Sequence, residues 1–303
     1  MSPNLKEIRR AVLRALMIGF HRSVRFIPYG LFKPLTRAVQ ACCFALFGAR
    51  LRRNAARTIT QAYGDQLSES EKKEIISGTF RHFGKVLTED LYYSQRPEYS
   101  DRVVDIAGRE HLDRALAAGK GAVVVSAHFG NFPLMIFYLR RAGYLSNAVI
   151  RPLRDRKIGR YAKEMMAAHG VGTVYSKPAR RCVRESVETL RQNKLLFVLM
   201  DQHYGTDARV EVDFFGRPAA AGASPVVLAR RTGAAVIPAF IVRDRDDDDR
   251  HRIEILPPLD LEQGGTQEQV LQKNMQTITD VIERYVRRYP CQWGWMHRRW
   301  KDG

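Results

Sequence analysis

The 303-residue sequence contains few cysteines, and the four that are present form no recognisable framework. Cys42 and Cys43 are adjacent in the chain, whereas Cys182 and Cys291 stand alone. The sequence has no Cys-x-x-Cys pair and no Cys/His set at zinc spacing, which excludes the common structural zinc sites and a disulfide-rich secreted fold. We therefore expect a reduced protein that faces the cytosol and uses no metal or other cofactor.

Long uninterrupted hydrophobic runs are also missing. A helix that spans a bilayer needs roughly 18–20 consecutive apolar residues, and Arg14, Arg22 and Arg25 interrupt the best candidate. No small-residue cleavage site follows an apolar core, so we do not expect an ordinary signal peptide. A tilted and poor transmembrane helix is the alternative that this pattern leaves open.

Acidic residues are scarce in the first 57 residues, where Glu7 stands against twelve lysines and arginines. This segment carries +11 of the net charge of +18. Large apolar residues are interleaved with the basic ones, which is typical of an amphipathic segment that lies on an anionic membrane. The alternative is a helix that packs on its own domain with a solvated basic face. The residues expected at the membrane are Arg10, Arg14, Phe20, Arg22, Arg25 and Phe26.

A basic chain needs an acidic partner, which can be nucleic acid, anionic lipid or an acidic carrier protein. The large apolar residues among the basic positions argue against nucleic acid. We therefore expect an anionic membrane and an acidic protein as partners, and no nucleic acid.

From residue 103 onward, strand patterns alternate with helical patterns. We expect strands at residues 103–106, 122–127, 148–151, 172–175, 195–200, 235–242 and 251–256. We expect helices at residues 66–95, 110–118, 132–142, 156–169, 180–192, 224–233 and 266–289. Such alternation predicts an α/β fold with a mostly parallel or mixed central sheet covered by helices.

Three features of the organisation complete this prediction. Residues 202–223 lack the hydrophobic periodicity of a helix or a strand and are expected to be irregular. The acidic run 244–249 is expected to be an exposed hairpin turn. The charge distribution divides the chain into a basic helical region, 1–60, and an α/β domain, 61–303.

A histidine follows the most β-branched run of the chain. Val123–Val125 leads through Ser126 and Ala127 to His128, and a Gly130-Asn131 turn then precedes an apolar helical pattern. An α/β fold presents a reactive imidazole in this way, at the carboxyl end of a buried strand and beside a helix N-terminus. Histidine is suited to take a proton from an alcohol near neutral pH. The same string equally fits a histidine that only caps the strand.

Three further polar strings lie at or just beyond predicted strand ends. They are Arg151-Pro-Leu153, Asp201-Gln-His-Tyr-Gly205 and Phe214-Phe-Gly-Arg217. Ligand sites of open α/β sheets collect along that edge. Together the four strings supply a base, an acid and two arginines, which indicates an α/β transferase or hydrolase.

In this order and spacing, the four strings resemble the lipid A late acyltransferases of Gram-negative bacteria, within the lysophospholipid and glycerol-phosphate acyltransferase superfamily. The resemblance covers nearly the whole chain and includes the block 214–240 and the ending Trp295–Trp300. It implies one glycerol-phosphate-acyltransferase-like domain on the cytoplasmic face of the inner membrane. It also implies transfer of a fatty acyl group from acyl carrier protein to a hydroxyl of a lipid A precursor or related membrane glycolipid.

The resemblance implies roles for individual residues. His128 is the expected general base, while Asn131 and the amides of the Gly130 turn stabilise the tetrahedral intermediate. Asp201 is the family's Asp-Gln-x-x-Gly acid or, as the alternative, a cap on the following loop. Arg151 lies near a phosphate, and Arg217 contacts a phosphate or braces its loop. The substrate-binding set implied in this way is Gly130, Arg151, Gln202, Gly205, Phe215 and Arg217.

One residue departs from the family pattern H-x4-D/E, in which an aspartate or glutamate stands five residues after the histidine. In this sequence Pro133 occupies that position. Proline is tolerated in the first turn of a helix, but the carboxylate that orients the imidazole is missing. Three alternatives remain. In the first, another acid, such as Asp201, Glu89 or Asp90, reaches His128. In the second, the enzyme works without a dyad on a more reactive substrate, such as an aminoacyl donor or a different lipid acceptor. In the third, the protein is catalytically inactive and only binds lipid.

Overall fold

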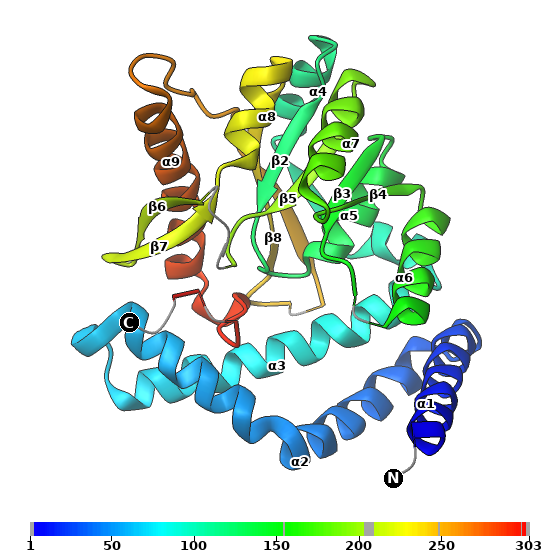
Figure 1. The fold of residues 1–303 in the computed structure, drawn as a ribbon. Helices are drawn as coiled ribbons and strands as arrows, with labels where there is room; N and C mark the ends of the chain where they lie inside the picture. The colour runs from blue at the N-terminus through cyan, green and yellow to red at the C-terminus, as the bar shows by residue number, and fades with distance from the viewer. Residues whose placement is uncertain (1–2, 154, 203–208, 248, 298, 301–303) are drawn as a thin grey trace.

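The computed structural model describes residues 3–153, 155–202, 209–247, 249–297 and 299–300, and it describes their side chains except at 3–10, 13, 39 and 41–47. Helices form the first third of the chain. They are α1 (Pro3–Ser23), η1 (Val24–Phe26), α2 (Tyr29–Tyr63), η2 (Gly64–Gln66), α3 (Glu69–Tyr93) and η3 (Pro97–Arg102). Figure 1 shows α2 and α3 running beneath the sheet. None of the described helices combines the length and the apolar character needed to cross a bilayer.

In the described part of the chain, a seven-stranded sheet forms the centre, in the order β1-β9-β8-β2-β5-β3-β4. Neighbouring strands are parallel except β8 and β9, which are antiparallel. The predicted α/β class and mostly parallel sheet are therefore confirmed. The strands are β1 (Val104–Ala107), β2 (Ala122–Ser126), β3 (Ser146–Ile150), β4 (Val171–Tyr175), β5 (Leu195–Leu199), β8 (Ala235–Arg243) and β9 (His251–Ile255).

Helices cover both faces of this sheet, because side chains of one strand point alternately to opposite sides. Val123 and Val125 of β2 join the core under α7, α8 and α9, whereas Val124 joins the core under α4 and α5. All five residues of β2 are buried, as expected for a central parallel strand. The covering helices are α4 (Arg109–Ala117), α5 (Phe132–Arg141), α6 (Arg156–Ala168), α7 (Ala179–Arg191), α8 (Ser224–Thr232) and α9 (Gln267–Arg288), which η4 (Pro290–Gln292) follows.

The expectation of an irregular stretch at 202–223 was wrong over most of its length. It contains a hairpin of β6 (Arg209–Phe214) and β7 (Arg217–Gly222). The alanine-rich β7 has no alternating pattern, but β6, with the sequence Arg-Val-Glu-Val-Asp-Phe, does alternate polar and apolar residues and is a strand signal that the prediction overlooked. Tertiary contacts also support the hairpin, because Gln276 and Glu283 of α9 accept hydrogen bonds from backbone amides of the hairpin, at 2.7 Å and 2.5 Å.

Two other expectations concern the acidic turn at 244–249 and the division of the chain at residue 60. The acidic run 244–249 does join the antiparallel strands β8 and β9, but Asp249 is half-buried and pairs with Lys33 and Lys85 rather than facing solvent alone. Helix α2 continues past residue 60, and Ala55 and Ile59 are buried in the core of the sheet domain. The division of the chain at residue 60 stays a prediction.

Candidate active site

The candidate site lies where the adjacent strands β2 and β5 end. Ser126 is in register with Leu199, and the amide of Met200 donates to the carbonyl of Ser126 at 2.9 Å. Two residues further along each chain, this register brings His128 beside Asp201. The pair therefore lies at the carboxyl edge of the sheet, where α/β folds bind their ligands.

His128 and Asp201 form a hydrogen-bonded dyad. The His128 Nδ1 atom lies 2.8 Å from Oδ1 of Asp201, whose Oδ2 accepts the His128 backbone amide at 3.0 Å. Burial lowers the pKa of His128, but the charge and hydrogen bond of Asp201 outweigh it and raise this pKa above 6.5. Burial raises the pKa of Asp201, and His128 and Trp293 together hold it below its usual value. Asp201 is therefore a carboxylate that stabilises the protonated imidazole.

The other ring nitrogen of His128 lies beside the side chain of Gln202. The side-chain amide of Gln202 lies 3.2 Å from the Nε2 atom of His128. The NH₂ group of Gln202 donates a hydrogen bond to this ring nitrogen, and the ring proton is on Nδ1, which donates to Asp201. The rings of Phe132 and His297 flank the imidazole, each with its centroid 5.1 Å away. The side chain of His128 is 23% exposed, so the ring is not sealed inside the core.

Of the three acids considered as replacements for the acid missing at Pro133, the structure brings Asp201 to the imidazole. Pro133 lies in the first turn of α5, where a proline costs no hydrogen bond. Glu89 instead forms an ion pair with Arg243. The carboxylate that contacts Nδ1 thus follows β5 rather than lying on α5, and Asp90, the third acid, forms a hydrogen bond with Asn131 instead.

Asn131 and the Gly130 amide are engaged elsewhere. The Asn131 side chain is fully buried; it caps α5 by accepting from the Leu134 amide at 3.0 Å and donates to Glu89 at 2.9 Å. The Gly130 amide donates to the Gln292 carbonyl at 2.8 Å. In this arrangement neither group is available to an oxyanion, so we correct the expected role of Asn131 to that of a helix cap that shapes the His128 turn.

Gly130 is required for steric reasons. Its φ is +57°, and a Cβ atom there would lie 1.8 Å from the Ile241 carbonyl oxygen. The turn after His128 therefore packs directly against the backbone of β8, which only glycine permits.

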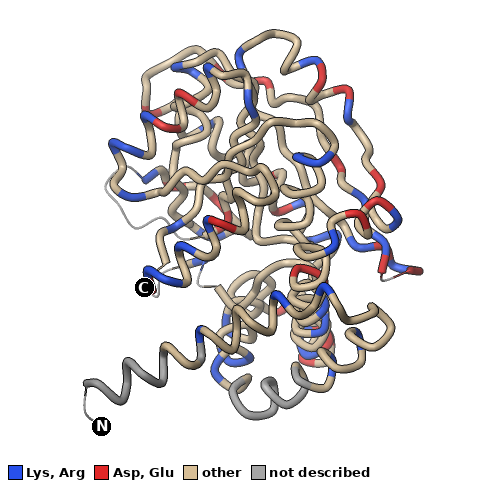
Figure 2. Tube along the Cα trace, turned by 90° about the vertical axis from the view of Figure 1, so that its right-hand side faces the viewer, with Lys and Arg blue, Asp and Glu red and all other residues tan. Residues whose placement is uncertain are grey.

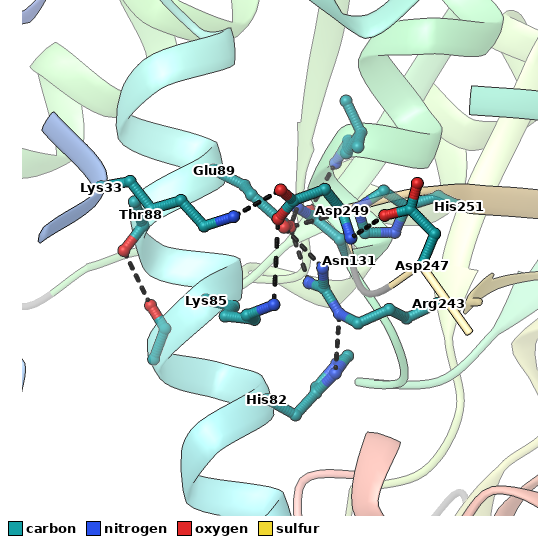
Figure 3. Close-up of polar contacts among 12 residues, drawn as sticks. Lys33, His82, Lys85, Thr88, Glu89, Asn131, Arg243, Asp247, Asp249 and His251 are labelled. Atoms are coloured by element: carbon teal, nitrogen blue, oxygen red, sulfur yellow. Dashed lines mark hydrogen bonds and ion pairs between the residues drawn. The ribbon is translucent and has the colours of Figure 1, made fainter. Parts of the chain in front are cut away.

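A buried ion pair supports this turn from α3 (Figure 3). Arg243, at the end of β8, donates to both carboxylate oxygens of Glu89, at 2.6 Å and 2.7 Å. His251 lies 3.3 Å from the same carboxylate, and the Arg243 Nε atom lies 3.3 Å from His82. Burial, together with the charge of Arg243, lowers the pKa of His82 to about 3. Glu89 is thus compensated by a cation and also orients Asn131.

The segment after α9 closes over the dyad. Trp293 forms an antiparallel bridge with Phe129, and the Gly294 amide donates to the His128 carbonyl at 3.0 Å. The indole Nε1 of Trp293, which is fully buried, donates to Oδ2 of Asp201 at 2.8 Å. A buried indole N–H needs an acceptor, but nothing in the sequence identifies Asp201 as that acceptor.

A second residue that the sequence did not single out is Arg299. It is almost fully buried, and its Nη1 atom donates to the Ala220 carbonyl at 2.6 Å and to the Gln202 carbonyl at 3.4 Å. Burial lowers the pKa of Arg299 to about 10. Arg299 therefore ties the start of the Asp201-Gln202 loop to β7.

Replacing Trp293 by phenylalanine tests its role as a positioning residue. Without the indole donor the Asp201 carboxylate is held less firmly in its orientation toward Nδ1, and because small misplacements of catalytic groups slow reactions strongly, we expect kcat/KM to fall about tenfold. The Asp201 carboxylate loses a donor and interacts more strongly with the imidazolium, so the acidic limb of the pH–rate profile should move to higher pH. The control is Trp295→Phe, because Trp295 donates to Pro290 and not to the dyad. The positioning role would be contradicted if Trp293→Phe left the acidic limb of the pH–rate profile unchanged. It would also be contradicted if Trp295→Phe lowered kcat/KM as much as Trp293→Phe does.

A comparison with protein families identifies the family of this chain. The family model described as bacterial lipid A biosynthesis acyltransferase matches residues 2–302. The chain belongs to this family.

Two kinds of enzyme are similar to this chain in sequence. A phosphatidylinositol mannoside acyltransferase of Mycobacterium tuberculosis is 27% identical over 200 residues, which cover 66% of the chain and 60% of that protein. A lipid A biosynthesis palmitoleoyltransferase of Escherichia coli is 27% identical over 263 residues, which cover 82% of the chain and 79% of that protein. The chain thus spans about 60% of the length of the mycobacterial relative.

The solved 1-acyl-sn-glycerophosphate acyltransferase PlsC of Thermotoga maritima is 14% identical, covers 79% of the chain and 95% of its own, and has a TM-score of 0.38. The fold assignment therefore depends on the sheet order given above.

Three other described residues are expected to bind substrate. Arg151 is exposed beyond β3, and Arg217 is exposed at the start of β7. Phe215 is buried, with a φ of +59°, and packs against Tyr63 and Trp295. It therefore closes the β6–β7 turn onto the core. Gly205 lies outside the described residues.

The residues expected at a membrane differ in their surroundings. Phe26 is 72% exposed and Phe20 is 42% exposed, and Arg22 and Arg25 are also exposed. Arg14 instead pairs with Asp155 at the start of α6, at 2.9 Å. The side chain of Arg10 lies outside the described residues.

Proposed function

We propose that this protein is an acyltransferase that moves a fatty acyl group from an acyl carrier protein thioester to a hydroxyl of a lipid A precursor or related membrane glycolipid. The observation that carries the proposal is the 2.8 Å contact between His128 and the buried Asp201. Membership in the lipid A biosynthesis acyltransferase family supports it. The dyad also argues against a catalytically inactive lipid-binding shell, which has no need of an oriented and partly exposed imidazole.

In the proposed reaction, Nε2 of His128 takes the proton of the acceptor hydroxyl as its oxygen attacks the thioester carbonyl. A C–O bond forms, and the resulting tetrahedral intermediate then breaks its C–S bond. The departing thiolate receives the proton from the imidazolium. Asp201 holds the ring in the required tautomer and stabilises its protonated form, while remaining a carboxylate throughout.

The intermediate carries a negative charge on oxygen that needs a hydrogen-bond donor. We assign this role to Gln202, because its amide already lies 3.2 Å from His128 Nε2 and its side chain is exposed. When a hydroxyl takes its place at Nε2, this amide is free to turn toward the carbonyl oxygen. The proposal thus replaces Asn131 by Gln202 as the donor.

The test is incubation of the purified protein with radiolabelled acyl carrier protein thioester and, in separate reactions, a lipid A precursor or a phosphatidylinositol mannoside. We expect a labelled lipid A precursor that disappears in His128→Ala. Equal labelling by the variant would remove His128 from the mechanism. Labelling of the mannoside alone would overturn the acceptor, and no product from either lipid would overturn the proposed transfer.

We further propose that the N-terminal helices contact the cytoplasmic face of an anionic inner membrane. Of thirteen exposed large apolar side chains among the described residues, eight lie within residues 12–51. Figure 2 shows Lys and Arg distributed along the helices below the sheet. Apolar side chains beside cations favour the interface of an anionic bilayer.

The double variant Phe26→Glu/Leu31→Glu tests this contact, because these two side chains are 72% and 67% exposed. Each apolar side chain that leaves water contributes about 1.5–3 kcal/mol, so binding to phosphatidylglycerol vesicles should weaken at least tenfold in a sedimentation assay. Leu145→Glu/Leu153→Glu is the matched control on exposed positions outside these helices, and its binding should be unchanged. If both pairs bind equally well, the N-terminal helices do not make the contact.

A further inference from the structure

A cavity of about 1040 Å³ lies between α2 and α3, away from the His128 site. The two helices are joined on either side of it. Gln40 of α2 donates to the Gly84 carbonyl and to Thr88 of α3, and Ile59 of α2 is buried in the same core as Ile75 of α3. The cavity is as large as the sites that proteins use for small molecules. It contains none of the residues that we place in the acyl transfer reaction.

The described residues that line the cavity are strongly basic. Seven of these fifteen residues are Lys or Arg, and Glu69 is the one acid among them. Glu69 pairs with the buried Lys72 at 2.8 Å and is itself 77% exposed, and Lys85 lies 3.8 Å from Asp249, which is not part of the lining. Cations that share one cavity repel each other, and low-dielectric walls strengthen their field, so an anion inside is stabilised. The cations are Arg37, Arg52, Arg53, Lys72, Lys73, Arg81 and Lys85.

The cavity also has an apolar part. Ala56 of α2 faces Ile76 and Phe80 of α3 across it, and Phe80 is a member of the buried core. An inorganic anion would contact only the lysines and arginines of the cavity, whereas an amphiphile would contact both its basic and its apolar part. Lysine and arginine side chains are the usual partners of phosphate oxygens. The lining therefore matches a phosphate group attached to a hydrocarbon chain.

We propose that this cavity binds the phosphate headgroup of an anionic phospholipid, with the first part of the acyl chain along Ala56, Ile76 and Phe80. An acidic protein is the less suitable occupant, because its carboxylates would use only the cations and would leave the apolar part at Ala56, Ile76 and Phe80 without a partner. The neighbouring α1–α2 region carries exposed apolar residues such as Leu31 and Leu35, which places the cavity beside the surface that we assign to the membrane. This site is a second lipid site, separate from the acceptor site.

Calorimetric titration of the full chain with dihexanoyl phosphatidylglycerol, below its micelle concentration, tests the proposal without any need for catalysis. Arg53→Glu/Lys73→Glu reverses two exposed charges of the cavity, and Arg180→Glu/Arg184→Glu reverses two exposed charges on α7, outside it. Both variants change the net charge equally. We expect the cavity variant to bind at least tenfold more weakly and the control variant to bind as the parent protein does. Dihexanoyl phosphatidylcholine should bind the parent at least tenfold more weakly than phosphatidylglycerol.

Several results would overturn the proposal. Equal weakening by both variants would mean that overall charge attracts the lipid. Binding of inorganic phosphate as tightly as the lipid would identify an anion site without a lipid role, and loss of acyl carrier protein binding alone in the cavity variant would identify a protein-docking surface. A photoreactive phosphatidylglycerol analogue gives a second measurement on the unmodified protein. It should label residues 52–60 and 72–85, and labelling confined to other segments would also overturn the assignment.

Discussion

Replacing Asp201 by asparagine is expected to lower kcat/KM for acyl transfer about 10⁴-fold, as neutralising the equivalent acid does in serine proteases. Asp201 now accepts hydrogen bonds from the His128 ring, the His128 amide and Trp293. An asparagine offers one acceptor oxygen for these donors, and its NH₂ group favours the opposite imidazole tautomer. The proton would then reside on Nε2, where the reaction needs a lone pair.

The pH dependence of kcat/KM provides a second readout for the same variant. His128 acts as a base only when it is neutral, so activity rises as the pH passes upward through its pKa. Asp201 raises the pKa of His128, and the acidic limb of the parent enzyme should therefore lie above pH 6.5. Without the carboxylate, burial lowers the pKa of His128, so the limb of Asp201→Asn should shift below that of the parent.

Asp201→Glu is the matched control, since it keeps the charge and changes only the reach of the side chain. We expect it to retain more activity than Asp201→Asn and to keep the raised acidic limb. The double variant His128→Ala/Asp201→Asn should be no slower than His128→Ala, because groups that act as a unit are not additive. A loss below tenfold in Asp201→Asn would show that this carboxylate does not serve the imidazole.

Replacing Arg243 by methionine is expected to lower the free energy of unfolding by about 3–5 kcal/mol, because it leaves a buried carboxylate without its cation. Both partners are buried: the side chains of Arg243 and Glu89 are 6% and 2% exposed. Such a loss is a large part of the roughly 5–15 kcal/mol that stabilises a typical protein. Urea denaturation followed by circular dichroism would measure it.

The control for Arg243 is Arg181→Met, which removes an exposed pair with Glu185 on α7, where the side chains are 57% and 28% exposed. Surface pairs of this spacing contribute about 0.3–0.5 kcal/mol, so a small change is expected. Glu89→Met/Arg243→Met removes both charges and should be more stable than Arg243→Met alone. If Arg243→Met and Arg181→Met unfold alike, the buried pair does not hold β8 to α3.

The local pattern was sufficient to locate the ends of β2 and β5, and therefore to identify His128 and Asp201 as candidates. Burial of both faces makes these strands nearly continuous apolar runs, which are readable in the sequence. Their partnership was not readable, because strand order depends on which strands pair across the sheet. His128 and Asp201 are separated by 73 residues in the chain, and only the register of Ser126 with Leu199 brings them together.

Amino-acid order alone determined the alternation of strands and helices, the concentration of positive charge in the first 57 residues and the presence of an imidazole after a buried strand. These features depend on residues close to one another in the chain. Tertiary structure alone decided that Asp201 is the acid in contact with His128, that Trp293 donates to it, and that Asn131 turns away toward Glu89. Each of these contacts joins segments at least 42 residues apart, and their pairing follows from how the sheet and helices pack, which no local period encodes.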